Sequence, residues 1–136
     1  MREMTVSATP DQIEQVVDFV NEQLDTLGCS DEVRIDVDVA IDELLGNIVQ
    51  YAYGSEGGTV TVRVDAQEEP PAAAITFMDH GAPFNPLAQE QPNTTALPAR
   101  ERPLGGLGLF LARKLMDELD YRYQDGQNVL TARKAL

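Results

Sequence analysis

The chain has few residues that would cross-link it, carry it into a membrane or attract nucleic acid. Its single cysteine, Cys29, cannot form an internal disulfide, so the fold does not require an oxidising compartment. Neither a basic-then-apolar leader nor an apolar run of membrane length is present, which predicts a cytoplasmic protein with no membrane partner. No sequence repeat is found, which argues against a solenoid.

Basic residues are scarce over most of the chain, and the formal net charge is −13. Residues 1–99 hold three basic and 18 acidic side chains, whereas residues 100–136 hold seven basic and five acidic ones. Such an acidic body repels a nucleic-acid backbone, which argues against DNA or RNA as a partner. A local basic patch beside the most glycine-rich stretch could still hold a small anion: Arg100, Arg102, Arg113 and Lys114.

The apolar residues are numerous enough for a packed core. They make up 43% of the 136 residues and are spread evenly, unlike in a disordered chain. This length suits one compact domain that buries roughly two-thirds of the surface of its unfolded form. We therefore expect a single domain over residues 1–136.

The periodicity of the apolar residues predicts three helices and five strands. Thr9 begins the first helix as a capping residue, and Gly28 ends it. Ser30 caps a long second helix, in which apolar residues occupy one broad arc. The expected helices span 9–28, 31–52 and 105–119, and the expected strands span 4–8, 59–65, 72–79, 121–124 and 128–134, the last two joined across Asp125-Gly126.

The order of these elements predicts the fold class. It favours an α+β two-layer sandwich, with a mixed, mainly antiparallel sheet and three helices on one face. Residues 80–104 contain five of the eight prolines and show no clear period. A loop of this length inside a small domain is usually functional or mobile.

Glu43 and Asn47 form the first candidate site. They are four residues apart on the polar arc of the second helix, so their side chains can point into one site. The asparagine oxygen suits Mg²⁺, and the carboxylate can accept a proton or orient a nucleophile. Taken alone, the pair is more simply explained as an ordinary solvated helix face.

The second and third candidates lie at the end of a strand and at the start of a helix. Asp79 ends an apolar strand, where it can accept a hydrogen bond from an exocyclic amine, and Gly81 would let the backbone approach the ring. A strand-ending turn is the simpler explanation of this motif. Glycines that open a helix can direct backbone N–H groups at phosphates, or can form a hinge: Gly105, Gly106 and Gly108, with Leu107 and Leu109 between and after them.

A triphosphate at these three sites would need its charge neutralised, because the first 99 residues repel it. Mg²⁺ on Asn47, the amides of the glycine turn and the basic residues near position 100 would supply that compensation.

The ordered set of motifs resembles the Bergerat-type ATP-binding fold. Within that fold, the segments DELLGNIVQYAYG, DHGAPFNP and GGLGLFLARKLMDELDY resemble the bacterial anti-sigma-factor serine/threonine kinases, from about Thr9 to Lys134. The resemblance implies that Asn47 holds Mg²⁺ against the phosphates of ATP and that Glu43 is the general base. It also implies that residues 84–104 form an ATP lid, from which Arg100 or Arg102 could reach a phosphate.

The resemblance assigns the remaining site residues as well. Asp79 would recognise adenine, and Gly81 would pack against the base. The turn formed by Gly105, Gly106, Leu107, Gly108 and Leu109 would bind phosphate. Two positions depart from the family pattern: Pro83 replaces a second glycine, and Gln127-Asn128 replaces a Gly-Thr pair that contributes a second adenine contact.

Three functions follow from the resemblance. The first is a kinase that transfers the γ-phosphoryl of ATP to a serine or threonine of an antagonist protein and binds a sigma factor, as a possible homodimer. The alternative is a nucleotide-dependent partner-binding module with little or no kinase activity, which could use the acidic helix surface of Asp36, Asp38 and Asp42. The third, a subunit of a larger histidine-kinase-like complex, is disfavoured because His80 is the only histidine and lies outside any dimerising helix.

Overall fold

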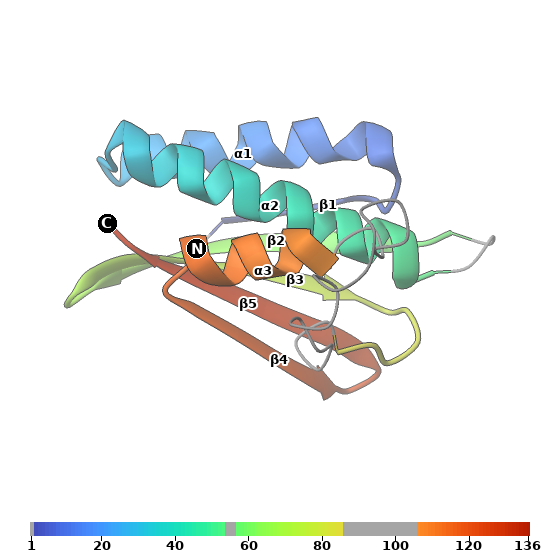
Figure 1. The fold of residues 1–136 in the computed structure, drawn as a ribbon. Helices are drawn as coiled ribbons and strands as arrows, with labels where there is room; N and C mark the ends of the chain where they lie inside the picture. Colours follow the sequence, from blue (N-terminus) through green and yellow to red (C-terminus); the bar gives the residue numbers. More distant parts are fainter. Residues whose placement is uncertain (1, 54–56, 86–105) are drawn as a thin grey trace.

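Helices and strands form two layers (Figure 1). The computed structural model describes residues 2–53, 57–85 and 106–136. Within them, five strands form one sheet in the order β1-β2-β3-β5-β4, and every neighbouring pair is antiparallel. The elements are β1 (Arg2–Ser7), a 3-10 turn (Pro10–Gln12), α1 (Ile13–Thr26), α2 (Asp31–Tyr51), β2 (Thr59–Glu68), β3 (Pro71–Asp79), α3 (Gly106–Leu115), β4 (Glu118–Gln124) and β5 (Gln127–Ala135).

The three helices lie on one side of the sheet. Figure 1 shows α1 and α2 together over one face, with α3 beside α2, and α2 packs against both other helices. The expected α+β sandwich is confirmed. The sheet is antiparallel throughout the described strands rather than mixed.

The register of the sheet determines which strand residues form the core and which polar residues lie at one end of the face that the helices cover. Val62 lies opposite Phe77, which lies opposite Leu130, and all three are buried under the helices. Because strand side chains alternate between faces, the positions two residues after Phe77 on β3 and two residues before Leu130 on β5 share that inner face. Those positions hold Asp79 and Asn128, which lie directly opposite each other and are also buried.

The long second helix matches its prediction closely. The hydroxyl oxygen of Ser30 accepts a hydrogen bond from the N–H of Val33 at 3.2 Å, which is the expected N-cap. The helix ends at Tyr51, one residue before the expected end. Its buried residues recur at helical spacing and face α1, α3 and the sheet: Val37, Ala40, Ile41, Leu44, Leu45 and Ile48.

The start of the first helix differs from its prediction. Thr9 has an extended backbone, but its side chain makes no capping hydrogen bond, and α1 begins only at Ile13. Hydrogen bonds from Thr9 and then from Gln12 instead hold the pKa of Asp11 below its usual value. The helix therefore begins after a short 3-10 turn rather than at a threonine cap.

The third helix is shorter than the expected span of 105–119. It ends at Leu115, and Leu119 lies in β4 opposite Ala132. An apolar residue at position 119 fits helical spacing as well as strand alternation, so only its pairing with β5 distinguishes the two. The turn Asp125-Gly126, which joins β4 to β5, is confirmed, and both residues have positive φ angles, of 55° and 78°.

The remaining strands occupy the expected parts of the chain but have different limits. The first strand, expected over 4–8, spans residues 2–7, and the strand expected over 59–65 continues to Glu68. Pairing with a neighbouring strand extends these elements into segments whose polar residues obscure the alternation.

Tyr53 ties the end of α2 to the sheet. Its hydroxyl donates to the carbonyl of Thr59 at 2.6 Å and accepts the backbone N–H of His80 at 2.8 Å. The segment after β3 is therefore held beside the last turn of α2, which brings the end of that helix and the end of β3 to one place.

Candidate nucleotide site

One pocket lies where α2 meets the ends of β3 and β5. The space inside it that a water-sized sphere can enter is about 20 Å³, so the pocket is narrow in this structure. Its walls combine apolar side chains with three buried polar ones. The lining residues are Asn47, Ile48, Ala52, Asp79, Phe84, Tyr121, Asn128 and Leu130.

Asp79 is one of the buried polar residues, with 3% of its surface exposed. Its Oδ1 accepts the backbone N–H of Gly81 and the side-chain amide of Asn128, both at 2.9 Å. Oδ2 accepts no hydrogen bond from the residues that the structure describes. A carboxylate held by one oxygen can offer the other to a hydrogen-bond donor in the pocket.

Asn47 lines the same pocket from α2 and is 7% exposed. Sequence periodicity places it on the polar arc of the helix, but the structure buries it. Its side chain makes no hydrogen bond within the described part of the chain, and its polar atoms are not among the fully buried ones that lack a partner. This leaves the carboxamide available to a ligand. The structure therefore brings together two predicted residues that are 32 positions apart.

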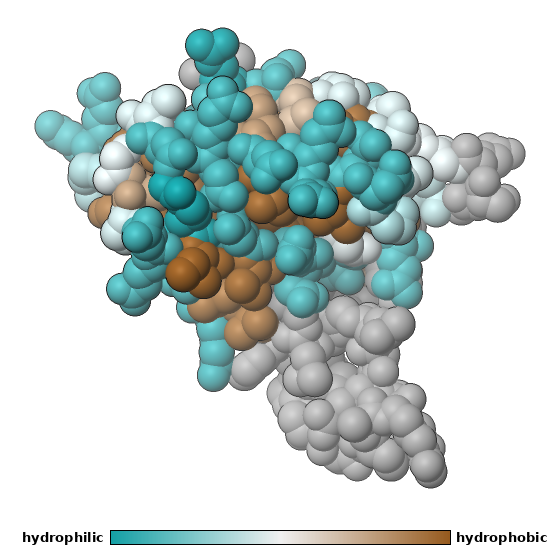
Figure 2. All heavy atoms as spheres, turned by 90° about the horizontal axis from the view of Figure 1, so that it is seen from above, coloured by the Kyte–Doolittle hydropathy of each residue, from teal (hydrophilic) through white to brown (hydrophobic). Residues whose placement is uncertain are grey.

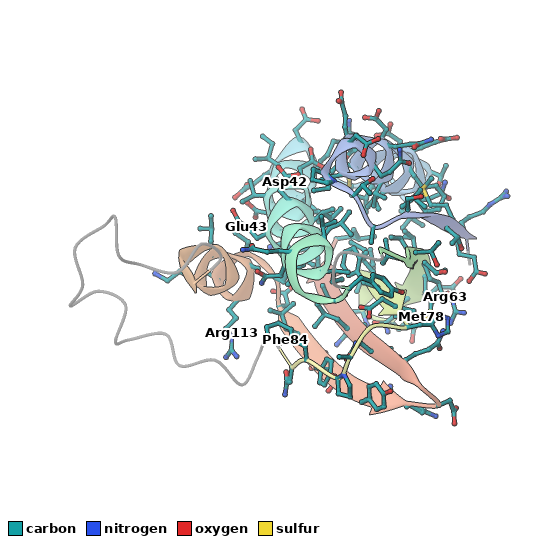
Figure 3. The ribbon with its side chains drawn as sticks, turned by 90° about the vertical axis from the view of Figure 1, so that its right-hand side faces the viewer. Asp42, Glu43, Arg63, Met78, Phe84 and Arg113 are labelled. Atoms are coloured by element: carbon teal, nitrogen blue, oxygen red, sulfur yellow. The ribbon has the colours of Figure 1, made fainter. Side chains whose placement is uncertain are left out.

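Glu43 lies one helical turn before Asn47, at intermediate exposure. It is not among the pocket-lining residues. Figure 3 shows it on the flank of α2 beside α3, with Arg113 projecting from α3 away from it. A carboxylate there can be reached from solvent, as a general base that acts on an incoming protein would have to be.

Gly81 is required by packing between backbone segments. A Cβ at this position would lie 1.9 Å from the carbonyl oxygen of Ala52 and 2.5 Å from its carbonyl carbon. Only glycine lets the segment after β3 approach α2 this closely. This packing gives a reason for the glycine that is separate from the expected contact with a base.

The glycine-rich turn is partly described. Gly105 lies outside the described residues, whereas Gly106, Leu107, Gly108 and Leu109 form the first turn of α3. The first four N–H groups of a helix lack intrahelical partners, and together with the helix dipole they favour an anion. The backbone therefore has the form expected of a phosphate-binding turn.

The expected basic patch is divided along α3. Arg113 and Lys114 occupy the last turn of the helix, about 10 Å along its axis from the first turn. Cations there complement the negative end of the helix dipole rather than face the glycine turn. Arg100, Arg102 and most of the expected lid, 84–104, lie outside the described residues, although Phe84 lines the pocket.

The donors present fit a magnesium ion that is held mainly by a ligand. Among the described residues, no group of three His, Cys, Asp or Glu side chains could form a metal site. Mg²⁺ usually keeps several waters and binds one or two protein oxygens together with substrate phosphates. The unengaged carboxamide of Asn47 fits the role of such a single protein ligand.

Asn128 belongs to the site, although in the sequence it stands out only as a departure from a family pattern. It is 5% exposed and contacts Asp79, the backbone of the segment after β3 and Tyr121. Asn128 follows a hairpin turn on a strand that alternates polar and apolar residues. This local pattern does not indicate its contacts. A prediction of the strand register would have placed it beside Asp79.

The helical face away from the sheet is largely hydrophilic (Figure 2). Asp36 forms an ion pair with Lys134 at 3.3 Å. Burial raises the pKa of Asp38, and the carboxylates of Asp42 and Asp18 raise it further, although a hydrogen bond with Asn21 and the charge of Arg34 act in the opposite direction. This face carries a hydrophobic patch in Figure 2, and the large apolar side chains exposed on the described helices are Ile35 (61%) and Leu111 (39%).

None of the helices in the described residues is long and apolar enough to cross a membrane.

Comparisons with known proteins agree with this geometry. The histidine kinase-like ATPase domain family matches residues 6–134. The serine-protein kinase RsbW of Bacillus mycoides is 33% identical over 98 residues, which are 70% of this chain and 60% of that protein. RsbW of Listeria innocua is 32% identical over 107 residues, covering 76% of this chain and 67% of that one. The match thus spans about three-fifths to two-thirds of the length of these relatives.

Solved structures show the same fold. The RsbU and RsbW domains of a Mycobacterium tuberculosis protein align with a TM-score of 0.63 at 18% identity, over 100% of this chain and 33% of that one. The SiaB–SiaC complex of Pseudomonas aeruginosa aligns with a TM-score of 0.58 at 17% identity, over 98% and 89%. The chain belongs to the histidine kinase-like ATPase domain family and, within it, is related to the RsbW serine-protein kinases.

Proposed function

We propose that this chain is an ATP-dependent serine/threonine protein kinase of the anti-sigma-factor type. It would transfer the γ-phosphoryl group of ATP to a hydroxyl of a small antagonist protein, and in another state it would bind a sigma factor. One observation carries the proposal: Asp79 at the end of β3 and Asn47 on α2 line the same pocket. Oδ2 of Asp79 and the carboxamide of Asn47 make no hydrogen bond with the described residues.

Each end of the nucleotide has a recognition group in this proposal. Oδ2 of Asp79 accepts the exocyclic amine of adenine, beside apolar walls that suit a flat ring. The amide groups at the start of α3, from Gly105 to Leu109, bind the phosphate chain. Asn47 holds Mg²⁺, which neutralises phosphate charge when bound. An acidic protein needs that neutralisation before it can bind a triphosphate.

Glu43 is the proposed general base. It lies one turn from Asn47 on the same side of α2, so the metal-binding oxygen and the base are neighbours. The base accepts the proton of the incoming serine or threonine hydroxyl, while positioning and charge neutralisation supply most of the catalysis. The relatives named serine-protein kinases support the proposed kinase activity.

Protein partners are part of the proposal. The antagonist must approach α2 from solvent to reach Glu43, and the exposed Ile35 and Leu111 offer it apolar surface. A neighbour of this chain was solved as a SiaB–SiaC complex, which supports partner binding by this fold. A cytoplasmic location and a homodimer complete the proposed assignment.

Calorimetric titration tests the nucleotide site first. The wild-type chain is titrated with ATP and ADP, each with and without Mg²⁺, and ATP should bind with an affinity that depends on the metal. The Asp79→Asn variant, which offers an amide at the position of the carboxylate, should lose adenine affinity by roughly tenfold or more. Absence of binding to the wild-type chain would refute the proposed function.

Phosphoryl transfer is tested with purified candidate antagonist proteins, ideally those encoded near the kinase gene. Glu43→Ala should abolish transfer while leaving ATP binding within about threefold of wild type, because the side chain lies outside the pocket wall. Normal transfer by Glu43→Ala would refute its role as base. Nucleotide-dependent binding of an antagonist without any transfer would select the alternative, a regulatory binding module.

A further inference from the structure

The side chain of Asn128 uses its whole hydrogen-bonding capacity within the protein. Its Nδ2 lies 2.9 Å from Oδ1 of Asp79, 3.0 Å from the carbonyl oxygen of Ala82 and 3.3 Å from that of Gly81. Its Oδ1 accepts the backbone N–H of Phe84 at 3.1 Å and the hydroxyl of Tyr121. An asparagine side chain has two N–H donors and two acceptor lone pairs, and these contacts occupy all four.

These contacts also fix the orientation of the amide. A flipped amide would place its oxygen against three acceptors and its NH₂ against two donors, so only one orientation is compatible with the surroundings. Because no donor or acceptor is left, Asn128 cannot add a hydrogen bond to a ligand without breaking one to the protein. A direct contact with a base at this position is therefore disfavoured.

The effect of Asn128 on the pocket is transmitted through Asp79. The two residues lie opposite each other on β3 and β5, and the amide holds Oδ1 of the carboxylate. The same oxygen accepts the N–H of Gly81, so the carboxylate is held by two donors on one side. With Oδ1 fixed in this way, Oδ2 has a defined direction in the pocket.

We propose that Asn128 is a positioning residue that sets the base selectivity of the site by holding the carboxylate of Asp79. This inference rests on the proposed nucleotide function. The ligand class is a purine nucleotide with an amino group at position 6 of the ring. An analogue with an oxygen there, such as inosine triphosphate, meets the fixed carboxylate with an acceptor and is rejected.

The test compares ATP with inosine triphosphate in three proteins. Wild type should prefer ATP by roughly 10- to 100-fold, as expected for a hydrogen bond to a charged group. In Asn128→Ala the carboxylate can rotate, and the preference should fall to about threefold or less, chiefly through weaker ATP binding. The matched control is Thr131→Val on the same strand, which removes a hydroxyl contact with Thr76 on the other face of the sheet. It should keep the wild-type ratio.

A second measurement does not depend on nucleotide. Hydrogen exchange in the free protein, followed by NMR, should accelerate at the amides of Gly81 and Phe84 in Asn128→Ala but not in Thr131→Val. In Asn128→Ala, the amide of Phe84 loses its acceptor, and the amide of Gly81 keeps a carboxylate acceptor that is no longer held in place.

The two measurements separate the possible failures. Failure of wild type to bind ATP refutes the proposed function. The exchange rates in the free protein would still test whether Asn128 holds the carboxylate of Asp79. If Asn128→Ala lowers the affinities for both nucleotides equally and keeps their ratio, the residue is only structural and the inference is wrong. Unchanged exchange at both amides would also overturn it.

Discussion

Replacement of Gly81 by alanine tests how tightly the end of β3 is packed against α2. The new Cβ would lie 1.9 Å from the carbonyl oxygen of Ala52, 2.5 Å from its carbonyl carbon and 2.9 Å from its Cα. Favourable carbon contacts lie at about 3.5–4.0 Å, so the two segments must separate by more than about 1 Å. Neither partner is a flexible side-chain end, because all three atoms are backbone.

The cost follows from what the separation disrupts. The N–H of Ala52 donates a hydrogen bond to the carbonyl of Ile48 at 2.9 Å, and the N–H of Gly81 donates one to Oδ1 of Asp79 at 2.9 Å. Separation of the two segments therefore strains both sides of the pocket. Overpacking of this kind costs about 1–3 kcal/mol, and backbone contacts place this case near the upper end. For a domain of this length, that corresponds to a fall in Tm of roughly 8–12 °C.

The assay is thermal unfolding of the nucleotide-free protein, with Gly46→Ala as the matched control. A Cβ at Gly46 meets nothing within 4 Å, and alanine there should raise stability by about 0.5–1 kcal/mol because it favours the helix. The opposite signs of two identical chemical changes would identify the contact with Ala52 as the cause. A Gly81→Ala protein with wild-type Tm would refute the reasoning.

Three further predictions concern the metal, a buried charge and a helix cap. Asn47→Ala should remove the dependence of ATP affinity on Mg²⁺ while leaving the metal-free affinity nearly unchanged in calorimetry; a retained metal dependence would exclude Asn47 as the metal ligand. Asp38→Asn should raise Tm at pH 7 but not near pH 3. Burial raises the folded-state pKa of Asp38, so its charged form destabilises the folded state only at the higher pH, and an equal gain at both pH values would contradict this cause. Ser30→Ala should cost about 1 kcal/mol in urea unfolding through loss of the cap on α2, whereas Thr9→Ala should cost less because Thr9 makes no such cap.

The local pattern of the sequence was sufficient for the elements whose signals are short-range. Ser30, followed by two acidic residues and a helical period, identified α2, and Asp125-Gly126 identified the last hairpin, because capping and turn geometry depend on neighbouring residues. Where two periods fit the same residue, as at Leu119, the pattern extended a helix into a strand. The pairing with Ala132 that decides this position involves residues distant in sequence.

By itself, then, the sequence determined the fold class, the family and the identity of most candidate site residues, since motifs and periodicity are local properties. Only the tertiary structure decided that Asn47 is buried, that Gly81 is required by the backbone of Ala52, and that Asn128 holds Asp79. The physical reason is that burial, close approach and hydrogen bonding between β3 and β5 depend on register and helix packing. Those arise from contacts between distant segments, such as Asp79 and Asn128, which are 49 positions apart, and no local pattern specifies them.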